Sequence, residues 1–134
     1  VRIDLIVRGI CCLIPGRKYS RNIRVTRIVD TFLEHARVWY FGNGGKPKLF
    51  LGSPDWMRRN LYRRIEAVTP ILDPDLKREL SDMLSIQLSD KRKACFVDDH
   101  LRNRWKSARP QKEKVRAQYT FYEYLKSGEL RVES

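Results

Sequence analysis

The pattern of apolar and polar residues along the chain predicts short strands that alternate with helices. Five runs rich in β-branched and aromatic residues have the length of strands, at residues 3–7, 38–41, 49–51, 65–71 and 94–97. The second and third runs are joined by residues 42–47, whose glycines and Asn43 supply the positive φ angles that a hairpin connection needs. We therefore expect these two strands to be antiparallel neighbours.

Two helices are predicted between these strands. In residues 25–33 the apolar residues recur at spacings of three and four, which is typical of a helix with one buried stripe. Arg24 and Arg27 fall off this stripe, so we expect them to face solvent or a ligand. A shorter helix is predicted over residues 56–61, with the carboxylate of Asp55 as its N-cap.

The second half of the chain contains the strongest helix signal. Asp73 is a favourable N-cap, Pro74 suits the first helical position, and Asp75 lies near the positive end of the helix dipole. The apolar stripe of this helix consists of Leu76, Leu80, Met83, Leu84 and Leu88. A last helix is expected over residues 112–126, ended by Gly128.

Together these elements predict an α/β fold, a layered domain with a mixed β-sheet flanked by helices. The 134 residues are close to the length of one typical domain, so we expect a single domain over residues 1–134. No apolar run approaches the ~20 residues of a membrane span, and no signal peptide opens the chain. The chain starts without Met and directly before an apolar run, which we interpret as a piece of a longer protein.

The cysteines and histidines do not form the pattern of a metal site. Cys11 and Cys12 are adjacent, Cys95 is distant, and no C-x-x-C pair occurs. His35 and His100 are the only histidines, too few for a closed four-ligand site with these cysteines. We therefore expect no bound metal on this chain, a reduced state for the thiols and a cytoplasmic location.

The basic residues are concentrated in two parts of the chain. The formal charge is +12, and residues 91–116 contain ten basic residues against three acidic ones. Residues 1–27 contain seven basic residues against one acidic residue, and residues 11–22 form a basic loop with Arg17, Lys18 and Arg21. Such clusters favour a polyanionic partner, while a solvated surface remains the alternative. If they guide a polyanion, neutralising Lys91, Arg92 and Lys93 should weaken its binding at low salt.

His35 and Arg37 suggest a phosphate site. Their i, i+2 spacing places both side chains on one face of an extended segment. Imidazole can act as a nucleophile or a proton donor, and a guanidinium offers a bidentate fork to phosphate oxygens. The alternative is a histidine that is favoured at the C-terminal end of the helix predicted over residues 25–33.

The residues that follow on the next elements extend this pattern. His35-x-Arg37 is followed by Asn43 and then by Gly-Ser-x-Asp at residues 52–55. This order is similar to the half-site of the phospholipase D superfamily, which has H-x-K, a later Asp and then G-S-x-N. In the present chain Arg37 replaces the Lys, Asn43 stands near the position of the Asp, and Asp55 replaces the Asn.

A closer resemblance covers nearly the whole chain. The segments at residues 7–12 (VRGICC), 32–37 (FLEHAR), 41–45 (FGNGG), 53–57 (SPDWM) and 114–118 (KVRAQ) occur in this order. They resemble the C-terminal part of bacterial polyphosphate kinases of the long, histidine-phosphorylated form. Enzymes of that family are several times longer and have an N-terminal domain, a head domain and two phospholipase-D-like C-terminal domains. The chain resembles the last of these four.

The resemblance implies reversible transfer of the ATP γ-phosphate to inorganic polyphosphate through a phosphohistidine in another domain. His35 matches a second histidine of the family, which faces the phosphorylated one and contacts the nucleotide, so a general acid or base role is expected for it. Arg8 matches an arginine that binds ATP phosphates, and Arg37 is expected to bind substrate beside it. Supporting roles are expected for Asn43, Ser53 and Asp55, and His100 matches no functional position.

The resemblance also implies the ligands and partners. These are ATP or ADP, inorganic polyphosphate, Mg²⁺ held mainly by other domains, the remaining domains of the same polypeptide, and further copies in a homo-oligomer. No specific nucleic acid is implied, and the location is cytoplasmic or peripheral to the inner membrane. Alone, the chain is expected to provide half of an active site and to be inactive.

Two other functions fit part of the sequence. A phospholipase-D-like phosphodiesterase or nuclease half-domain would pair two copies of His35 in a dimer. A basic nucleic-acid-binding module without chemistry would explain the charge, but not the order of the motifs around His35, Asn43 and Asp55.

Overall fold

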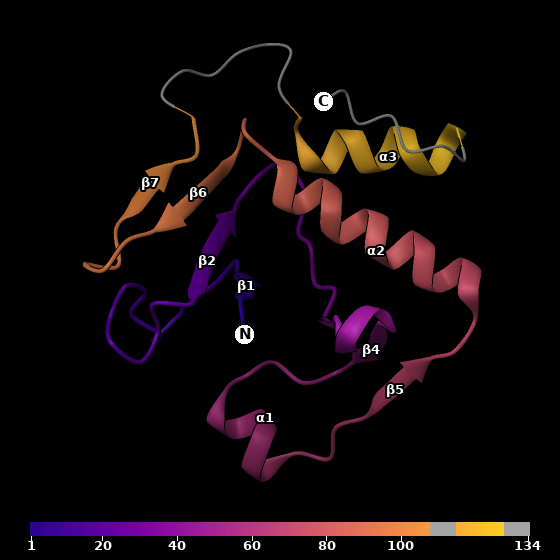
Figure 1. Ribbon diagram of the computed structural model, residues 1–134, viewed down its shortest axis with the longest axis horizontal. Coiled ribbons are helices and arrows are strands. Elements are labelled where there is room, and N and C mark those ends of the chain that lie inside the picture. Colours follow the sequence, from indigo (N-terminus) through magenta and orange to yellow (C-terminus); the bar gives the residue numbers. More distant parts are fainter. Residues whose placement is uncertain (108–114, 128–134) are drawn as a thin grey trace. The chain divides into compact units, whose positions relative to one another are not determined.

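The computed structural model describes residues 1–107 and 115–127 and combines strands with helices (Figure 1). The strands are β1 (Ile3–Ile6), β2 (Ile23–Ile28), β3 (Val38–Phe41), β4 (Lys48–Gly52), β5 (Val68–Ile71), β6 (Ala94–Val97) and β7 (Asn103–Trp105). The helices are α1 (Arg58–Arg63), α2 (Pro74–Ser89) and α3 (Ala117–Ser127), with a 3₁₀ turn η1 at Asn43–Gly45. The expected mixed α/β class is therefore confirmed.

The chain divides into two compact units, each of which is described by itself. Val1–Phe32 and Leu84–Ser134 belong to the first unit, and Leu33–Met83 form the second. A single domain over residues 1–134 stays a prediction. In the described residues, no helix has the length and apolar character needed to cross a membrane.

The first unit contains a four-stranded mixed sheet in the order β1-β2-β6-β7. Strands β1 and β2 are parallel, and β6 pairs antiparallel with both β2 and β7. The mixed sheet predicted from the sequence is therefore present, with β7 as a strand that the sequence pattern did not reveal. Residues 11–22 contain no regular helix or strand, as the basic loop predicts.

Strand β2 replaces the helix predicted over residues 25–33, so that prediction was wrong. Val25 and Thr26 are both almost fully buried although they point to opposite faces of the sheet, and Ile28 is buried as well. A strand that is buried on both faces lacks the polar alternation by which strands are recognised, and its apolar spacing then matches a helix by chance. The β-branched side chains in this segment, which favour strands, were the overlooked signal.

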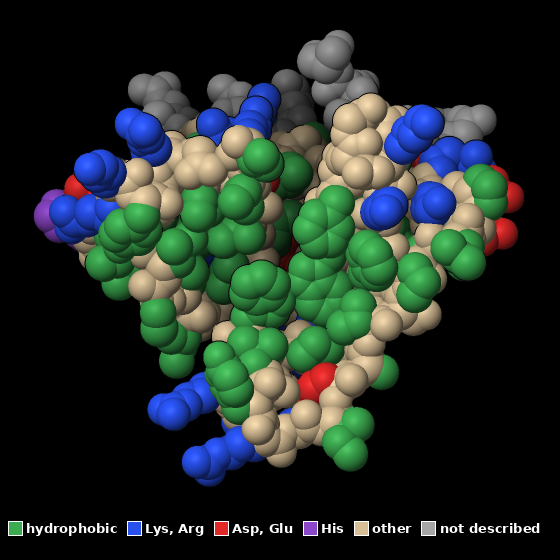
Figure 2. Space-filling model, turned by 60° about the horizontal axis from the view of Figure 1, so that its bottom comes forward, with side chains coloured by type: hydrophobic (Ala, Val, Ile, Leu, Met, Phe, Trp, Pro, Cys, Tyr) green, Lys and Arg blue, Asp and Glu red, His purple; other side chains and the backbone are tan. Residues whose placement is uncertain are grey.

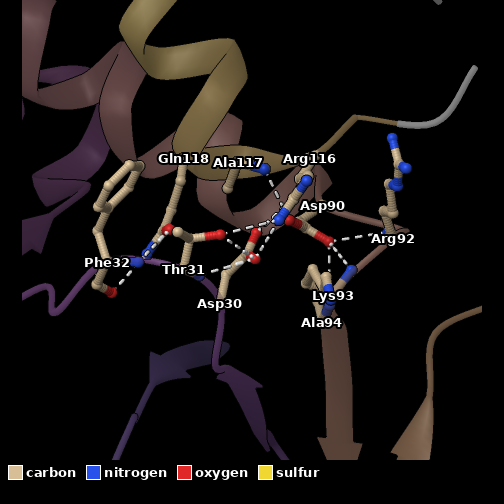
Figure 3. A network of polar contacts seen from close by, with 10 residues as sticks. All are labelled: Asp30, Thr31, Phe32, Asp90, Arg92, Lys93, Ala94, Arg116, Ala117 and Gln118. Carbon is tan, nitrogen blue, oxygen red and sulfur yellow. Dashed lines mark hydrogen bonds and ion pairs between the residues drawn. The ribbon is translucent and has the colours of Figure 1, made fainter.

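Asp90 connects three elements of the first unit just after α2 ends (Figure 3). Its Oδ1 accepts hydrogen bonds from the backbone N–H groups of Arg92, Lys93 and Ala94, at 2.9, 2.6 and 2.9 Å. Its Oδ2 accepts one from the N–H of Ala117, at 2.7 Å. The fully buried carboxylate thus joins the end of α2 to the beginnings of β6 and α3. The surrounding core contains Ile28, Ile86, Ala94 and Ala117.

A second group of polar contacts joins α3 to the segment after β2 (Figure 3). Arg116 donates to both carboxylate oxygens of Asp30, at 2.8 and 2.6 Å, and this ion pair is the main reason that the pKa of Asp30 is lowered. The side-chain amide of Gln118 accepts from the N–H of Phe32 and donates to its carbonyl, each at 2.8 Å. Segment 30–32 is therefore held by both side-chain and backbone contacts.

The second unit contains a separate antiparallel sheet in the order β3-β4-β5. The predicted hairpin between β3 and β4 is confirmed, and its turn has positive φ angles of 45° at Asn43, 61° at Gly44 and 87° at Gly45. Strand β5 begins at Val68, three residues later than the sequence pattern suggested. The sequence predicted one mixed sheet, whereas the hairpin belongs to a second sheet of its own.

The helix predictions were correct to different degrees. Asp73 caps α2 as expected, because its Oδ1 accepts from the N–H groups of Asp75 and Leu76 at 2.8 and 2.9 Å. The stripe was only partly right: Leu76 is half-exposed, whereas Ile86 is fully buried. Helix α1 begins at Arg58 instead of residue 56 and has no side-chain cap. Helix α3 begins at Ala117, while residues 112–114 and the predicted end at Gly128 lie outside the described residues.

Hydrophobic and basic side chains both reach the surface of the molecule. In the view of Figure 2, green hydrophobic side chains cover much of the face and blue basic side chains are far more frequent than red acidic ones. In the second unit, Trp56 is 77% exposed and Tyr62 is 79% exposed. The excess of basic side chains agrees with the formal charge of +12.

Candidate functional site

One end of the β3-β4-β5 sheet brings the predicted site residues together. At this end β3 and β5 begin and β4 ends. The ladder continues for one residue beyond the strands, because the N–H of Gly52 donates to the carbonyl of Arg37 at 3.1 Å and that of Ser53 donates to the carbonyl of Ala67 at 2.9 Å. Side chains just before β3, just after β4 and just before β5 therefore become neighbours.

Arg37 bridges His35 and Asp55 in this cluster. Its Nε donates to Asp55 Oδ1 at 2.8 Å, and its Nη2 lies 2.5 Å from His35 Nε2. The side chains of His35 and Arg37 thus meet, as their i, i+2 spacing predicts. His35 Nε2 lies 3.9 Å from Asp55 Oδ1, so the guanidinium is the direct contact of both groups. The three side chains form what we call the His35–Arg37–Asp55 cluster.

The contact with Arg37 determines which nitrogen of His35 is an acceptor. A guanidinium has only N–H donors, so the lone pair of His35 Nε2 must accept. In this arrangement the ring proton belongs on Nδ1. The His35 side chain is 67% exposed, which leaves the ring open to a ligand, whereas the Arg37 side chain is only 22% exposed. Arg37 is therefore the fixed member of the pair and His35 the accessible one.

The charges of the cluster stabilise one another. The hydrogen bond from Arg37 is the main reason that the pKa of Asp55 is lowered, and the hydrogen bond to Asp55 is the main reason that the pKa of Arg37 is raised. Asp55 is therefore ionised at neutral pH and acts as a hydrogen-bond acceptor. This explains why it does not cap α1, since its carboxylate is directed to Arg37. The predicted capping role of Asp55 was wrong.

Glu66 and Asn60 were missed by the sequence reasoning. Glu66 Oε2 accepts a short hydrogen bond from Ser53 Oγ, and Glu66 Oε1 accepts one from Asn60 Nδ2 at 2.8 Å. These two bonds, that from Ser53 first, lower the pKa of Glu66. Ser53 Oγ also accepts from the N–H of Ala67 at 3.1 Å. Ser53 therefore has a structural role in joining the loop after β4 to the beginning of β5.

Gly52 allows a close contact beneath the cluster. A Cβ atom added at Gly52 would lie 2.6 Å from Cζ3 and 2.7 Å from Cη2 of the Trp39 ring, which is too close for any other residue type without a shift. The Trp39 ring thus packs directly on the backbone of the strand that leads to Ser53 and Asp55. This contact is a structural reason for the glycine of the Gly-Ser-x-Asp motif.

Asn43 does not belong to the cluster. It lies in η1 at the opposite end of the β3–β4 hairpin, the length of a four-residue strand away, or about 13 Å at 3.3 Å per residue. Its Nδ2 donates to the carbonyl of Lys46 at 3.0 Å and closes the turn. The structure therefore gives Asn43 a turn-forming role and separates it from the residues it was predicted to support.

Arg8 lies directly after β1 in the first unit. The parallel ladder continues to the N–H of Val7, which donates to the carbonyl of Thr26 at 2.9 Å, so Arg8 follows the carboxyl end of a strand as predicted. Within the described residues its exposed side chain has no hydrogen bond or ion pair, so its donors are available to an anion. An approach of Arg8 to His35 stays a prediction, because the two residues belong to different units.

The described residues do not fit a magnesium site. Among residues 1–107 and 115–127, no group of three or more His, Cys, Asp or Glu side chains could hold a metal ion. The carboxylate of Asp55 is paired with Arg37, and that of Glu66 accepts from Ser53 and Asn60. No step of the chemistry below is therefore assigned to a metal on this chain.

Comparisons with known proteins identify relatives over almost the whole chain. The family model described as polyphosphate kinase C-terminal domain 2 matches residues 1–118. The polyphosphate kinase of Escherichia coli (strain K12) is 49% identical over 130 residues, which are 96% of this chain and 19% of that protein. The polyphosphate kinase of Synechocystis sp. (strain ATCC 27184 / PCC 6803 / Kazusa) is 57% identical over 95 residues, 70% of this chain and 13% of that protein.

The fold agrees with a solved structure. The crystal structure of polyphosphate kinase from Porphyromonas gingivalis superposes with a TM-score of 0.90 at 58% identity, over 96% of this chain and 20% of that chain. The chain thus spans about a fifth of the length of the Escherichia coli protein and of the Porphyromonas gingivalis chain. Because the family match covers residues 1–118 and the identities are about one half, the chain belongs to the polyphosphate kinase family, where it corresponds to C-terminal domain 2.

Proposed function

We propose that this chain provides part of the active site of a polyphosphate kinase, which transfers the γ-phosphate of ATP reversibly to inorganic polyphosphate. The observation that carries the proposal is the His35–Arg37–Asp55 cluster, in which an exposed imidazole is held by a guanidinium at one end of a sheet. Because the chain spans about a fifth of its relatives, a complete active site requires residues from outside it.

The proposed chemistry depends on positioning and charge. Arg37 uses one N–H for Asp55 and one for His35, which leaves three of its five donors for phosphate oxygens. A guanidinium in this place neutralises charge that develops on a transferred phosphoryl group, which is the main requirement of phosphoryl transfer. Asp55 keeps the guanidinium in orientation, since it is ionised and bonded to Nε.

His35 is proposed to act on a phosphate oxygen of the nucleotide, as a hydrogen-bond donor or general acid. Its Nδ1–H donates to a phosphate oxygen, while its Nε2 stays bonded to Arg37. We infer that the phosphorylated histidine implied by the family resemblance, and most of the residues that would hold Mg²⁺, come from other domains; the ion would neutralise phosphate charge when bound. Arg8 is proposed to bind phosphates of ATP.

The test is a substitution of His35 in a complete polypeptide that includes these residues. With His35→Gln, we expect ATP-dependent polyphosphate synthesis and the reverse formation of ATP to fall by about 10²- to 10⁴-fold, the usual contribution of general acid–base catalysis. Both directions should fall together, because one site catalyses them. The measurement is the initial rate in each direction, with thermal unfolding recorded to show that the variant is folded.

His100 provides the matched control. It is an exposed histidine whose Nε2 lies 3.8 Å from the carboxylate of Asp99, and it belongs to no cluster of predicted site residues. His100→Gln should retain the rates of the wild-type protein. If His35→Gln retains them as well, the proposed role of His35 is wrong. If the wild-type polypeptide makes no polyphosphate but cleaves phosphodiesters, the phospholipase-D-like alternative replaces the proposed function.

A further inference from the structure

The first unit contains a basic cavity whose described lining includes none of the predicted site residues. Its volume is about 220 Å³, and it lies over β1, β2 and β6 beside the end of α2. The residues that give it its character are Arg2, Asp4, Arg24, Lys91, Phe96 and Lys106. Since a water molecule occupies about 30 Å³ in the liquid, the cavity is large enough for several waters or for a short phosphate segment.

The cavity has an excess of positive charge. Among the described residues that line it, Asp4 is the only one with a carboxylate, and this carboxylate is already paired with Arg2, through distances of 2.8 and 3.3 Å. The charges of Arg24, Lys91 and Lys106 therefore remain without an anionic partner in the cavity. In the described part of the chain, neither the guanidinium of Arg24 nor the ammonium of Lys91 makes a hydrogen bond or an ion pair. Their donors are free for a ligand.

Phe96 organises two of these cations. The guanidinium carbon of Arg24 lies 5.3 Å from the centroid of its ring, and the ammonium nitrogen of Lys106 lies 5.1 Å from it. Lys106 also donates to the carbonyl of Leu88 at 2.9 Å, which leaves two of its three N–H groups for other acceptors. Burial lowers the pKa of Lys106, so a bound anion would favour the ammonium form. Arg24 and Lys106 are thus both positioned by Phe96 before any ligand binds.

This arrangement favours a phosphate chain over a nucleic acid. Proteins that bind single-stranded nucleic acid combine basic side chains with aromatic rings on which bases stack. Here the aromatic surface of Phe96 is already occupied by Arg24 and Lys106. A ligand with phosphoryl groups and no bases uses the cations without needing the ring.

We propose that this cavity is a binding subsite for the inorganic polyphosphate chain, formed by Arg24, Lys91 and Lys106. The proposal rests on the proposed function, since it assumes that polyphosphate is the substrate. The subsite gives the protein a further contact with the polymer, made by the unit that does not contain His35. Such a contact increases the affinity for long polymers and leaves the affinity for the nucleotide unchanged.

The test compares two double variants in a complete polypeptide that includes these residues. Arg24→Gln with Lys91→Gln removes two cations that have no hydrogen-bond or ion-pair partner among the described residues, although Arg24 also lies over the ring of Phe96. The control, Lys46→Gln with Lys48→Gln, removes the same charge from two exposed residues at the β3–β4 hairpin. The readouts are the affinity for long-chain polyphosphate at several salt concentrations and the KM for ADP in the direction of ATP formation.

For the Arg24 and Lys91 variant we expect the affinity for polyphosphate to fall about tenfold or more, since bonds to charged groups are worth roughly this factor or more. The slope of log affinity against log salt should fall by about 1.4, if polyphosphate releases counterions as single-stranded nucleic acids do. The KM for ADP should not change. The charge-retaining pair, Arg24→Lys with Lys91→Arg, should keep most of the affinity, which separates loss of charge from loss of folding.

Three results would overturn the subsite. The first is that the Arg24 and Lys91 Gln variant keeps the wild-type affinity for polyphosphate and the wild-type salt slope. The second is that the Lys46 and Lys48 control loses as much affinity for polyphosphate. The third is that the Arg24 and Lys91 variant loses as much affinity for a single-stranded oligonucleotide of the same charge. The last result would make the cavity a nonspecific basic surface. The proposed function fails by a different result, a wild-type polypeptide without polyphosphate synthesis, so the two failures are distinguishable.

Discussion

Arg37 contacts two site residues at once, and this double contact decides how a substitution there acts. The Nε of its guanidinium contacts Asp55, and the Nη2 contacts His35. The sequence alone indicated that His35 and Arg37 share a face, because their spacing is local. It did not indicate that Arg37 binds Asp55, because that contact depends on the register between β3 and β4. Nor did it indicate Glu66, which reaches Ser53 only through the pairing of β4 with β5.

We predict that Arg37→Lys impairs catalysis although it preserves the charge. A lysine ammonium is a point charge and does not reproduce the planar fork that holds both partners. The imidazole would lose its fixed position, and kcat should fall by up to about 100-fold, the cost of a small misplacement of a reacting group. The measurement is kcat for polyphosphate synthesis in a complete polypeptide that includes these residues. A wild-type kcat would contradict the positioning role of Arg37.

The same substitution should change the titration of Asp55. Because the pKa of Asp55 is lowered in the folded protein, its ion pair stabilises the fold above the ordinary value of 3.8. That contribution is lost as the pH falls through the lowered pKa. In Arg37→Lys the pKa of Asp55 should move back up, because the hydrogen bond from Arg37 is the main cause of its lowering. Carboxyl NMR titration measures this shift, and an unchanged pKa would show that other groups hold Asp55.

At the scale of elements, the buried carboxylate of Asp90 joins α2, β6 and α3. Asp90→Ala would leave the buried N–H groups of Ala94 and Ala117 without acceptors. At about 1–3 kcal/mol for each such group, the free energy of unfolding should fall by about 2–6 kcal/mol. Asp90→Asn should cost less, because one oxygen remains for the three donors at Arg92, Lys93 and Ala94.

Urea unfolding together with hydrogen exchange at the amides of Ala94 and Ala117 measures this effect. The control is Asp99→Ala, since the Asp99 side chain is 52% exposed and a surface change of this kind stays within about 0.5 kcal/mol. Equal stability of Asp90→Ala and Asp99→Ala would contradict the joining role of Asp90.

The elements show why local patterns predict some strands and miss others. The β3–β4 hairpin was predictable, because its glycine-rich turn and flanking β-rich runs carry the signal locally. Strand β2 was not, because burial on both faces removes the polar alternation. Strand β7 is a three-residue edge strand, Asn103–Trp105, with every residue exposed, so nothing in its composition distinguishes it from a loop.

At the scale of the whole molecule, the sequence indicated the kind of partner but not the place where it binds. A charge of +12 favours a polyanion, and clusters at residues 1–27 and 91–116 were visible. Arg24 and Lys91 lie far apart in the sequence and meet in one cavity only because β2 pairs with β6 and α2 returns beside them. The division of the strands between two sheets was likewise not predictable from the sequence, because it depends on which strands pair and not on where they begin.

The net charge by itself predicts that polyphosphate and single-stranded DNA of equal charge bind alike and that both fade with salt. A formed phosphate site predicts a preference for polyphosphate that persists at moderate salt. We expect this preference in a complete polypeptide that includes these residues, and we expect Arg8→Ala to reduce it. Arg8 has no ion pair in the described part of the chain, and it follows the carboxyl end of β1, where α/β sheets place ligands. Lys18→Ala, which removes one exposed charge from the loop after β1, should keep it. The measurement is a titration of the polypeptide with both polymers at low and moderate salt. If the two polymers bind with equal affinity, or if Arg8→Ala and Lys18→Ala change the preference equally, Arg8 contributes only to a general basic surface.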